Sequence, residues 1–260
     1  MVSGYLTALA DGYDVIAKVD GDGQMDPALL PMFLKPILEG RADYTKGNRF
    51  YDLRHITRMP ALRMLGNALL SGLAKVSTGY WNVFDPTNGY TAIDARVLER
   101  IPLDRVSRRY FFETDMLFRL STLRAVVLDV PMDAVYSGET SSLRVRSVVL
   151  EFGFKHAINI IKRIGYNYFL RDISIATLEL LTGAGMLGFG LIFGTMTWME
   201  SARTGTASQL GTIMLSVLPT LLGVQLLLAF IAFDMSSVPT QPVAHLFRGA
   251  RGSQARQPLI

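Results

Sequence analysis

Two long apolar stretches in the C-terminal third constrain the fold of this chain most strongly. Residues 173–199 carry one charge, on Glu179, and residues 210–233 carry none. Each stretch exceeds the ~20 apolar residues that a helix needs to cross a bilayer. The linker between them, residues 200–209, is short and polar. The sequence therefore predicts two transmembrane helices in a hairpin over residues 172–234.

Basic residues flank both outer ends of this hairpin: Lys155, Lys162, Arg163 and Arg171 before it, and Arg248, Arg251 and Arg256 after it. Because positive charge collects on the cytoplasmic side, we expect an inner-membrane protein whose N-terminal region and C-terminus face the cytoplasm. The net charge of +4 and the pI of about 9.4 suit an anionic membrane surface. The sequence has no basic and aromatic platform for nucleic acid, so we expect no nucleic-acid partner. It also has no cysteine, which excludes disulfides and thiolate chemistry.

An acidic turn follows the first predicted strand. Residues 13–18 are rich in β-branched and aromatic side chains, and residues 28–38 predict a helix. Asp20 and Asp22 therefore lie at the C-terminal tip of a strand, where open α/β sheets bind ligands. Mg²⁺ takes one or two such carboxylates and completes its shell with water and phosphate oxygens. An ordinary Asp-Gly turn remains the alternative, whereas an EF-hand is excluded because its twelfth loop position is Pro31.

Further along the chain, polar residues follow or interrupt the predicted elements. Residues 42–50 predict a second strand with a basic tip, followed by arginines that suit an anionic substrate or a charged surface. Residues 81–92 predict a tight loop, and a helix opens near residue 110 with two acids that either cap it or face the crevice. Residues 126–132 predict a final strand, and the polar loop 136–146 is placed to close over a diphosphate.

The order of these motifs resembles the family 2 glycosyltransferases, in the branch of dolichol-phosphate mannose synthases and bacterial polyprenyl-phosphate glycosyltransferases. The motifs are D-G-D-G-Q-M-D-P, K-G-N-R-F, D-P-T-N-G-Y, F-F-E-T-D-M and E-T-S-S-L, followed by the two apolar spans. The resemblance implies a GT-A catalytic domain that transfers a hexose, with inversion, from a GDP- or UDP-sugar to undecaprenyl or dolichyl phosphate. It also implies a divalent cation, Mg²⁺ or Mn²⁺, and leaves a homo-oligomer open.

The resemblance assigns roles to individual residues. The metal motif falls on Asp20, Asp22 and Gln24, and the acidic pair near the sugar, together with Asp22, supplies the catalytic candidates Glu113 and Asp115. Residues expected to bind the donor and its sugar are Asp20, Asp85, Asn88, Gly89 and Arg144, the last in place of the family's loop lysine. Residues expected to bind the acceptor phosphate are Arg49, Arg63 and Asn67.

The resemblance also predicts the domain organisation. The family's first strands, which recognise the nucleotide base, have no counterpart, so we expect residues 1–146 to form a partial GT-A domain that lacks them. Interfacial amphipathic helices are expected over residues 147–171, and a cytoplasmic basic tail over residues 235–260. Three rival interpretations are a processive polysaccharide synthase, a non-catalytic module that binds polyprenyl phosphate or a membrane partner, and a small channel or transporter subunit.

Overall fold

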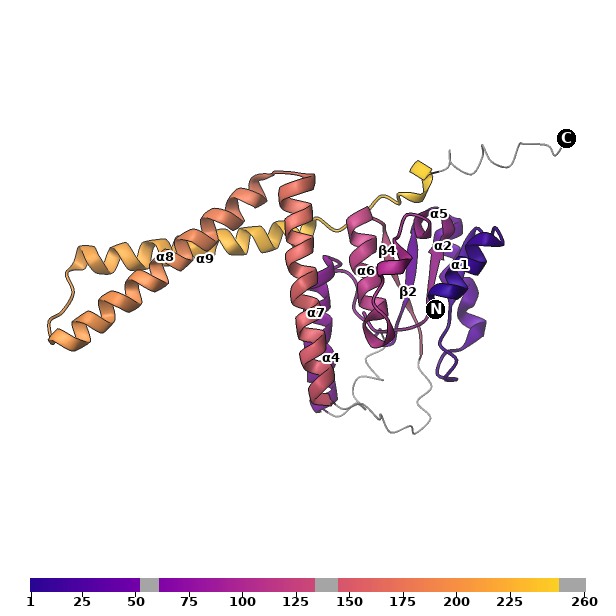
Figure 1. The fold of residues 1–260 in the computed structure, drawn as a ribbon, viewed down its shortest axis with the longest axis horizontal. Helices are drawn as coiled ribbons and strands as arrows, with labels where there is room; N and C mark the ends of the chain where they lie inside the picture. The colour runs from indigo at the N-terminus through magenta and orange to yellow at the C-terminus, as the bar shows by residue number, and fades with distance from the viewer. Residues whose placement is uncertain (52–60, 134–144, 248–260) are drawn as a thin grey trace. The chain divides into compact units, whose positions relative to one another are not determined.

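The computed structural model describes residues 1–51, 61–133 and 145–247, with the backbone alone for residues 61–65, 110 and 145–150. It divides into two compact units, which Figure 1 shows in colours that run along the chain. The first unit comprises Met1–Arg163 and Val238–Ile260, and the second comprises Ile164–Ser237. The apolar spans are therefore inserted within the sequence of the first unit.

The first unit is built on a four-stranded mixed sheet. Its strands are β1 (Val15–Lys18), β2 (Tyr44–Asn48), β3 (Thr91–Asp94) and β4 (Val127–Pro131), in the order β1-β3-β2-β4. Strand β3 is antiparallel to both β1 and β2, and β2 is parallel to β4. The predicted α/β class is confirmed. The sheet is mixed, because the end of the predicted loop 81–92 forms the antiparallel strand β3.

Each face of the sheet packs against different helices. On one face, the register aligns Ile16, Ile93, Tyr44 and Val127 across the four strands. These side chains join a buried core with α1 (Val2–Ala10), α5 (Ala95–Leu98) and α6 (Phe112–Leu123). On the other face, Ala92 and Val130 pack against Phe33 and Ile37 of α2 (Leu30–Leu38). The sheet is thus covered on both sides, as its apolar strands require.

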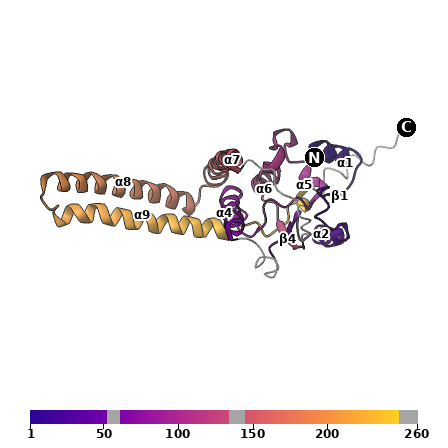
Figure 2. The same cartoon turned by 90° about the horizontal axis from the view of Figure 1, so that it is seen from below.

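Two further helices of the first unit lie side by side (Figure 2). They are α4 (Ala61–Thr78) and α7 (Val145–Gly165). The hydroxyl of Ser77 in α4 lies 2.7 Å from Nδ1 of His156 in α7, and both side chains are buried. Burial lowers the pKa of His156 to about 4, so the imidazole is neutral at physiological pH. A buried polar pair therefore joins these two helices.

The segment that follows the second apolar span belongs to the first unit. Both carboxylate oxygens of Asp43 accept backbone hydrogen bonds from it, 2.9 Å from Val243 N and 2.8 Å from Ala244 N. Asp43 also accepts from Val126 N at 2.7 Å and is fully buried. The short helix η5 (Ala244–Phe247) then places Phe247 beneath the guanidinium of Arg100. Residues 235–260 were expected to form a tail, yet Val238–Phe247 is built into this core.

The second unit contains the two long apolar helices. The π-helical turn η4 (Tyr166–Arg171) precedes α8 (Ile175–Thr204) and α9 (Leu210–Ser236). Both long helices have the length and hydropathy needed to cross a membrane. They pack closely through Gly190 and Gly223, where an added Cβ would meet the facing backbone at 2.8 Å and 2.5 Å. At the open end of the hairpin, the Tyr168 hydroxyl donates to Asp234 at 2.5 Å.

Candidate functional site

The acidic turn after β1 is open to solvent. The Asp22 carboxylate is exposed and accepts a hydrogen bond from the backbone N–H of Gln24 at 3.1 Å. Gly23 has a φ of +74°, a conformation that suits glycine, so the sharp turn depends on it. The Asp20 side chain is 42% exposed. Both carboxylates therefore remain accessible to a ligand in solution.

Lys18, the last residue of β1, joins three separate parts of the chain. Its ammonium group donates to Asp20 at 2.8 Å, to Glu113 of α6 at 2.8 Å and to the carbonyl of Gly89 at 3.2 Å. Burial lowers the pKa of Lys18, but the carboxylates of Glu113 and Asp20 outweigh that effect and hold it above its usual value. The acidic turn, the loop before β3 and the start of α6 thus converge on one cation.

Gly89 lies directly beneath the Asp20 carboxylate. A Cβ atom built on Gly89 would lie 1.8 Å from Asp20 Oδ2, closer than any two such atoms approach. A side chain at position 89 would therefore displace that carboxylate or the loop. This close contact explains why a glycine suits position 89.

The loop before β3 is held by polar contacts of Asp85 and Asn88. The buried Asp85 carboxylate receives a fork from Arg49, at 2.7 Å from Nε and 3.1 Å from Nη2. The Asn88 amide accepts from Tyr90 N at 2.8 Å and donates to Asp85 at 3.4 Å. These contacts order the loop, and they place the predicted residues Arg49, Asp85, Asn88 and Gly89 together.

The two acids at the start of α6 point to different partners. Glu113 contacts Lys18 beside Asp20, as described above. Asp115 instead accepts from the backbone N–H of Ser107 at 2.7 Å and from the guanidinium of Arg119 at 3.2 Å. Glu113 therefore shares the partner Lys18 with Asp20. The described contacts of Asp115 instead connect α6 to the loop that precedes it.

A row of polar residues forms the floor of the site. Across the four strands the register aligns Lys18, Thr91, Lys46 and Asp129, on the face that carries the apolar core. The sheet thus changes from apolar to polar in the row nearest the acidic turn. Lys46 and Asp129 in this row were not among the predicted site residues. Their signal was present, because each is a charged residue inside a predicted strand.

Burial alters the titration of both overlooked residues. Lys46 is fully buried, which lowers its pKa to about 8, and its ammonium donates a short hydrogen bond to the carbonyl of Asn88. Burial raises the pKa of Asp129 to about 6. One oxygen of Asp129 accepts from Phe84 N at 2.9 Å and from Asn48 Nδ2 at 3.0 Å, and its other oxygen is buried without a hydrogen bond.

The remaining predicted residues are placed less completely. Arg63 and Asn67 lie one helical turn apart in α4, and Asn67 is partly buried. The side chain of Arg63 and the whole of Arg144 lie outside the described part of the structure. Gln24 follows the acidic turn and is partly buried. The predicted roles of these four residues stay predictions.

The donor set of the acidic turn suits a divalent cation. Among the described residues, no three acidic or histidine side chains cluster as a metal site. Two carboxylates suffice for a Mg²⁺ ion that keeps water and substrate phosphates in its shell. Asp20 and Asp22 supply two such carboxylates, both accessible to solvent. The residues present therefore fit a cation that a phosphate-bearing substrate helps to hold.

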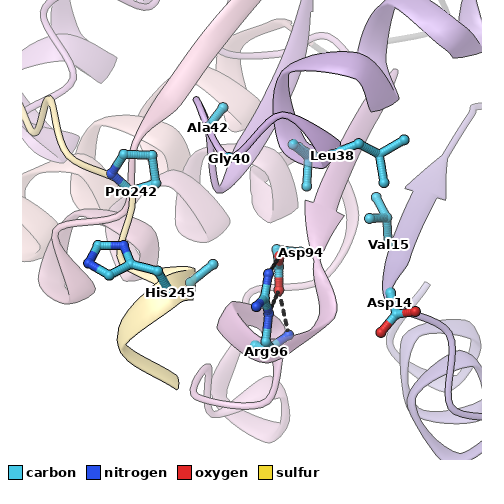
Figure 3. Close-up of a pocket in the computed structure, with 11 residues that line it drawn as sticks. Asp14, Val15, Leu38, Gly40, Ala42, Asp94, Arg96, Pro242 and His245 are labelled. Atoms are coloured by element: carbon cyan, nitrogen blue, oxygen red, sulfur yellow. Dashed lines mark hydrogen bonds and ion pairs between the residues drawn. The ribbon is translucent and has the colours of Figure 1, made fainter. Parts of the chain in front are cut away.

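A separate cavity lies at the opposite end of the sheet. It has a volume of about 410 Å³ and opens beside Asp14 and Val15, at the start of β1. Figure 3 shows Asp94 and Arg96 in contact there, with Pro242 and His245 from the C-terminal segment nearby. None of the predicted site residues lines this cavity. The acidic turn and the cavity are therefore distinct features of the first unit.

Comparison with known proteins identifies the relatives of this chain. No family model matches it. An undecaprenyl-phosphate mannosyltransferase from Micrococcus luteus is 32% identical over 135 residues, which cover 52% of this chain and 54% of the relative. A UDP-N-acetylglucosamine–dolichyl-phosphate N-acetylglucosaminyltransferase from Methanococcus voltae is 24% identical over 161 residues, covering 62% and 63%. These relatives confirm the resemblance to polyprenyl-phosphate glycosyltransferases. The matched region spans little more than half the length of these curated relatives.

Solved structures show a weaker likeness. Two structures of glucosyl-3-phosphoglycerate synthase from Mycobacterium tuberculosis cover 63% of this chain and 54% of their own. One is a complex with Mn²⁺, UDP-glucose and glycerol 3-phosphate, at 14% identity and a TM-score of 0.39. The other is a complex with UDP, at 18% identity and a TM-score of 0.40.

Proposed function

We propose that this protein transfers a hexose, with inversion, from a nucleotide sugar to a polyprenyl phosphate at the cytoplasmic face of a membrane. One observation carries the proposal: Asp20, Glu113 and the Gly89 loop converge on Lys18 at the C-terminal end of β1. Ligands bind at that end of the strands in open α/β sheets. The curated relatives support the choice of polyprenyl phosphate as acceptor, since both are named for such lipids.

The proposed reaction is a single in-line displacement. An oxygen of the lipid phosphate forms a bond to the anomeric carbon, and the bond from that carbon to the diphosphate oxygen breaks. A phosphate monoester has a second pKa of about 6 and is mostly dianionic at neutral pH. The acceptor therefore needs no strong general base, and the chain's own residues serve mainly to bind and orient the two substrates.

The acidic turn would hold the donor. Asp20 and Asp22 would bind a divalent cation, which when bound would neutralise the charge that develops on the departing nucleoside diphosphate. Glu113, positioned by Lys18, would anchor hydroxyl groups of the sugar. Asp115 retains its predicted catalytic role only as a weaker candidate, because its described contacts lead to Ser107 and Arg119.

The arginines of the site would bind the phosphate group of the acceptor. Asp85 fixes the guanidinium of Arg49 by a fork, so Arg49 would meet a phosphate in a preset orientation. Arg63 and Asn67 on α4, and Arg144, remain proposed contacts to phosphate groups. The two apolar helices would keep the site close to the lipid carrier, consistent with their length and hydropathy.

A transfer assay tests the proposal. The full chain in membrane vesicles is incubated with undecaprenyl phosphate and labelled GDP-mannose or UDP-N-acetylglucosamine, with Mg²⁺ or Mn²⁺ present. We expect label to enter the organic phase from one of these donors, and Asp20→Ala to reduce that transfer at least 100-fold. Glu39→Ala, at the exposed C-terminal end of α2, is the control. Absence of labelled lipid with both donors would overturn the proposal and favour the non-catalytic module.

A further inference from the structure

Two lysines hold two consecutive carbonyl groups of the loop before β3. Lys46 on β2 donates to the carbonyl of Asn88, and Lys18 on β1 donates to the carbonyl of Gly89. Both lysines face Thr91 of β3 in the register of the sheet, one from each side. These carbonyls belong to the peptide groups on either side of Gly89, so the backbone at Gly89 is held from two strands at once.

Lys46 is a fully buried lysine beside the candidate site, which is unusual for a charged side chain. Its side chain is fully buried, and the proposed reaction gives it no contact with either substrate. Burying an ammonium group costs several kcal/mol unless nearby charges compensate it. The charged groups that act on Lys46 are Glu113 of α6, Asp85 of the loop, Lys18 of β1 and Asp129 of β4. The first unit thus maintains a buried cation at this place.

The loop that Lys46 holds has little freedom to move. A Cβ on Gly47, next to Lys46, would lie 2.8 Å from the side-chain amide nitrogen of Asn88 and 2.5 Å from the sulfur of Met132. Above the loop, the Asp20 carboxylate rests against Gly89. Because packing is tight on both sides, a shift of the Asn88–Gly89 peptide changes the position of the Asp20 carboxylate.

We propose that Lys46 is a positioning residue, whose ammonium group fixes the Asn88–Gly89 peptide and thereby the Asp20 carboxylate that binds the donor. The binding of the donor by Asp20 rests on the proposed function. The effect on the peptide is a property of the folded chain, and it can be measured without any substrate.

The first experiment compares Lys46→Met with Lys35→Met. Met keeps the length and the apolar stem of lysine but removes the ammonium group, and Lys35 is a surface lysine on α2 with a side chain 70% exposed. Hydrogen exchange is followed at the amides of Asn88 and Tyr90, which bond within the loop. We expect exchange at least tenfold faster in Lys46→Met, with the amides of α2 unchanged. Unchanged loop exchange in a folded Lys46→Met protein would overturn the proposal.

A second measurement needs no variant and stands even if Lys46→Met does not fold. In the unaltered chain, exchange at Asn88 and Tyr90, corrected for base catalysis, should be constant to about pH 7. It should then rise as Lys46 loses its proton, whose pKa is lowered by burial to about 8. A corrected rate that stays flat to pH 9.5 would count against the ammonium group as the element that holds the loop.

A third readout links the loop to Asp20. Mn²⁺ titrated into the full chain should bind at least tenfold more weakly to Lys46→Met than to Lys35→Met. Equal Mn²⁺ affinity would refute the step from the loop to the carboxylate. If the unaltered chain transfers no sugar, the proposed function fails, while the exchange result on Lys46 still decides the positioning role.

Discussion

At the scale of single residues, Lys18 is where the parts of the site meet. Its ammonium group already binds one oxygen of Asp20, so a metal ion that approaches the acidic turn meets a carboxylate that is partly neutralised. Asp22 has no such lysine among its described contacts. The two acids of the D-G-D sequence are therefore electrostatically different, although they look alike in the sequence.

Replacing Gly89 with alanine should disturb the site directly. The new Cβ would overlap the Asp20 carboxylate, so Gly89→Ala should weaken Mn²⁺ binding at least tenfold and reduce transfer by a similar factor. Calorimetric titration of Mn²⁺ measures the first effect. Gly72→Ala in α4 is the matched control, since an added Cβ there meets no atom within 4 Å. Equal Mn²⁺ affinities of the two variants would refute the close contact.

Asp129 should make stability depend on pH. Its pKa is raised by burial from about 3.8 to about 6, so between these values the folded state binds a proton that the unfolded state has lost. Stability therefore falls as pH rises from about 4 to about 6, by on the order of 3 kcal/mol. Asp129→Asn should lack this fall, and chemical unfolding at several pH values in detergent measures it.

Asp104→Asn is the control for that experiment, because it makes the same substitution at a surface position, where the side chain is 78% exposed. Parallel stability profiles for the unaltered chain and Asp129→Asn would show that Asp129 titrates normally in the folded state.

At the scale of elements, the sequence predicted the helices and strands whose residue pattern is long or regular. The two apolar helices, β1, β2, β4 and the helix that opens near residue 110 all follow from periodicity and composition. Strand β3 has only four residues and directly follows the turn signals Asn88 and Gly89, so its pairing with β1 and β2 is decided by the tertiary structure. Lys46 and Asp129 stand out in the sequence as charged residues inside predicted strands, but their alignment with Lys18 depends on that register.

Within the site, the residues named from the motifs include Asp20 and Gly89, which lie in contact, and Arg49, Asp85 and Asn88, which share hydrogen bonds. Lys18 and Lys46 were not predicted, because a lysine inside a short strand has no distinctive spacing. Which of the acids Glu113 and Asp115 faces the crevice depends on the position of α6 relative to β1, and spacing along the chain does not contain that information.

The C-terminal segment should detach when Asp43 loses its charge. In Asp43→Asn an amide N–H₂ group would face one of the backbone N–H donors, leaving at least one hydrogen bond unmade and costing about 1–3 kcal/mol. We expect the amides of Val243 and Ala244 to exchange at least tenfold faster with solvent. Asp104→Asn again serves as the control, and unaltered protection of both amides would contradict this anchoring role.

At the scale of the whole molecule, the chain combines an α/β unit with a unit of two apolar helices. The predicted topology places the N-terminal region in the cytoplasm and the link between α8 and α9 on the other side of the membrane. Lipid phosphates and nucleotide sugars would then meet at a single face, which is what the proposed reaction needs.

Cysteine labelling checks that topology, because the chain has no cysteine of its own. Thr206→Cys in the exposed link between α8 and α9 should react with a membrane-impermeant maleimide in intact cells. Ser3→Cys in α1 should react only after the membrane is permeabilised, since a membrane blocks the charged reagent. Labelling of Ser3→Cys in intact cells would place the first unit outside the cytoplasm and reverse the predicted orientation.

The anchoring of Val243 and Ala244 by Asp43 has a consequence for biosynthesis. These hydrogen bonds join residues about 200 positions apart in the sequence. During translation they can therefore form only after both apolar helices have left the ribosome. Contacts so distant in sequence form late, so the first unit is still incomplete when α8 and α9 emerge. If these helices enter a membrane as proposed, their insertion would precede the final closure of the core on which the site is built.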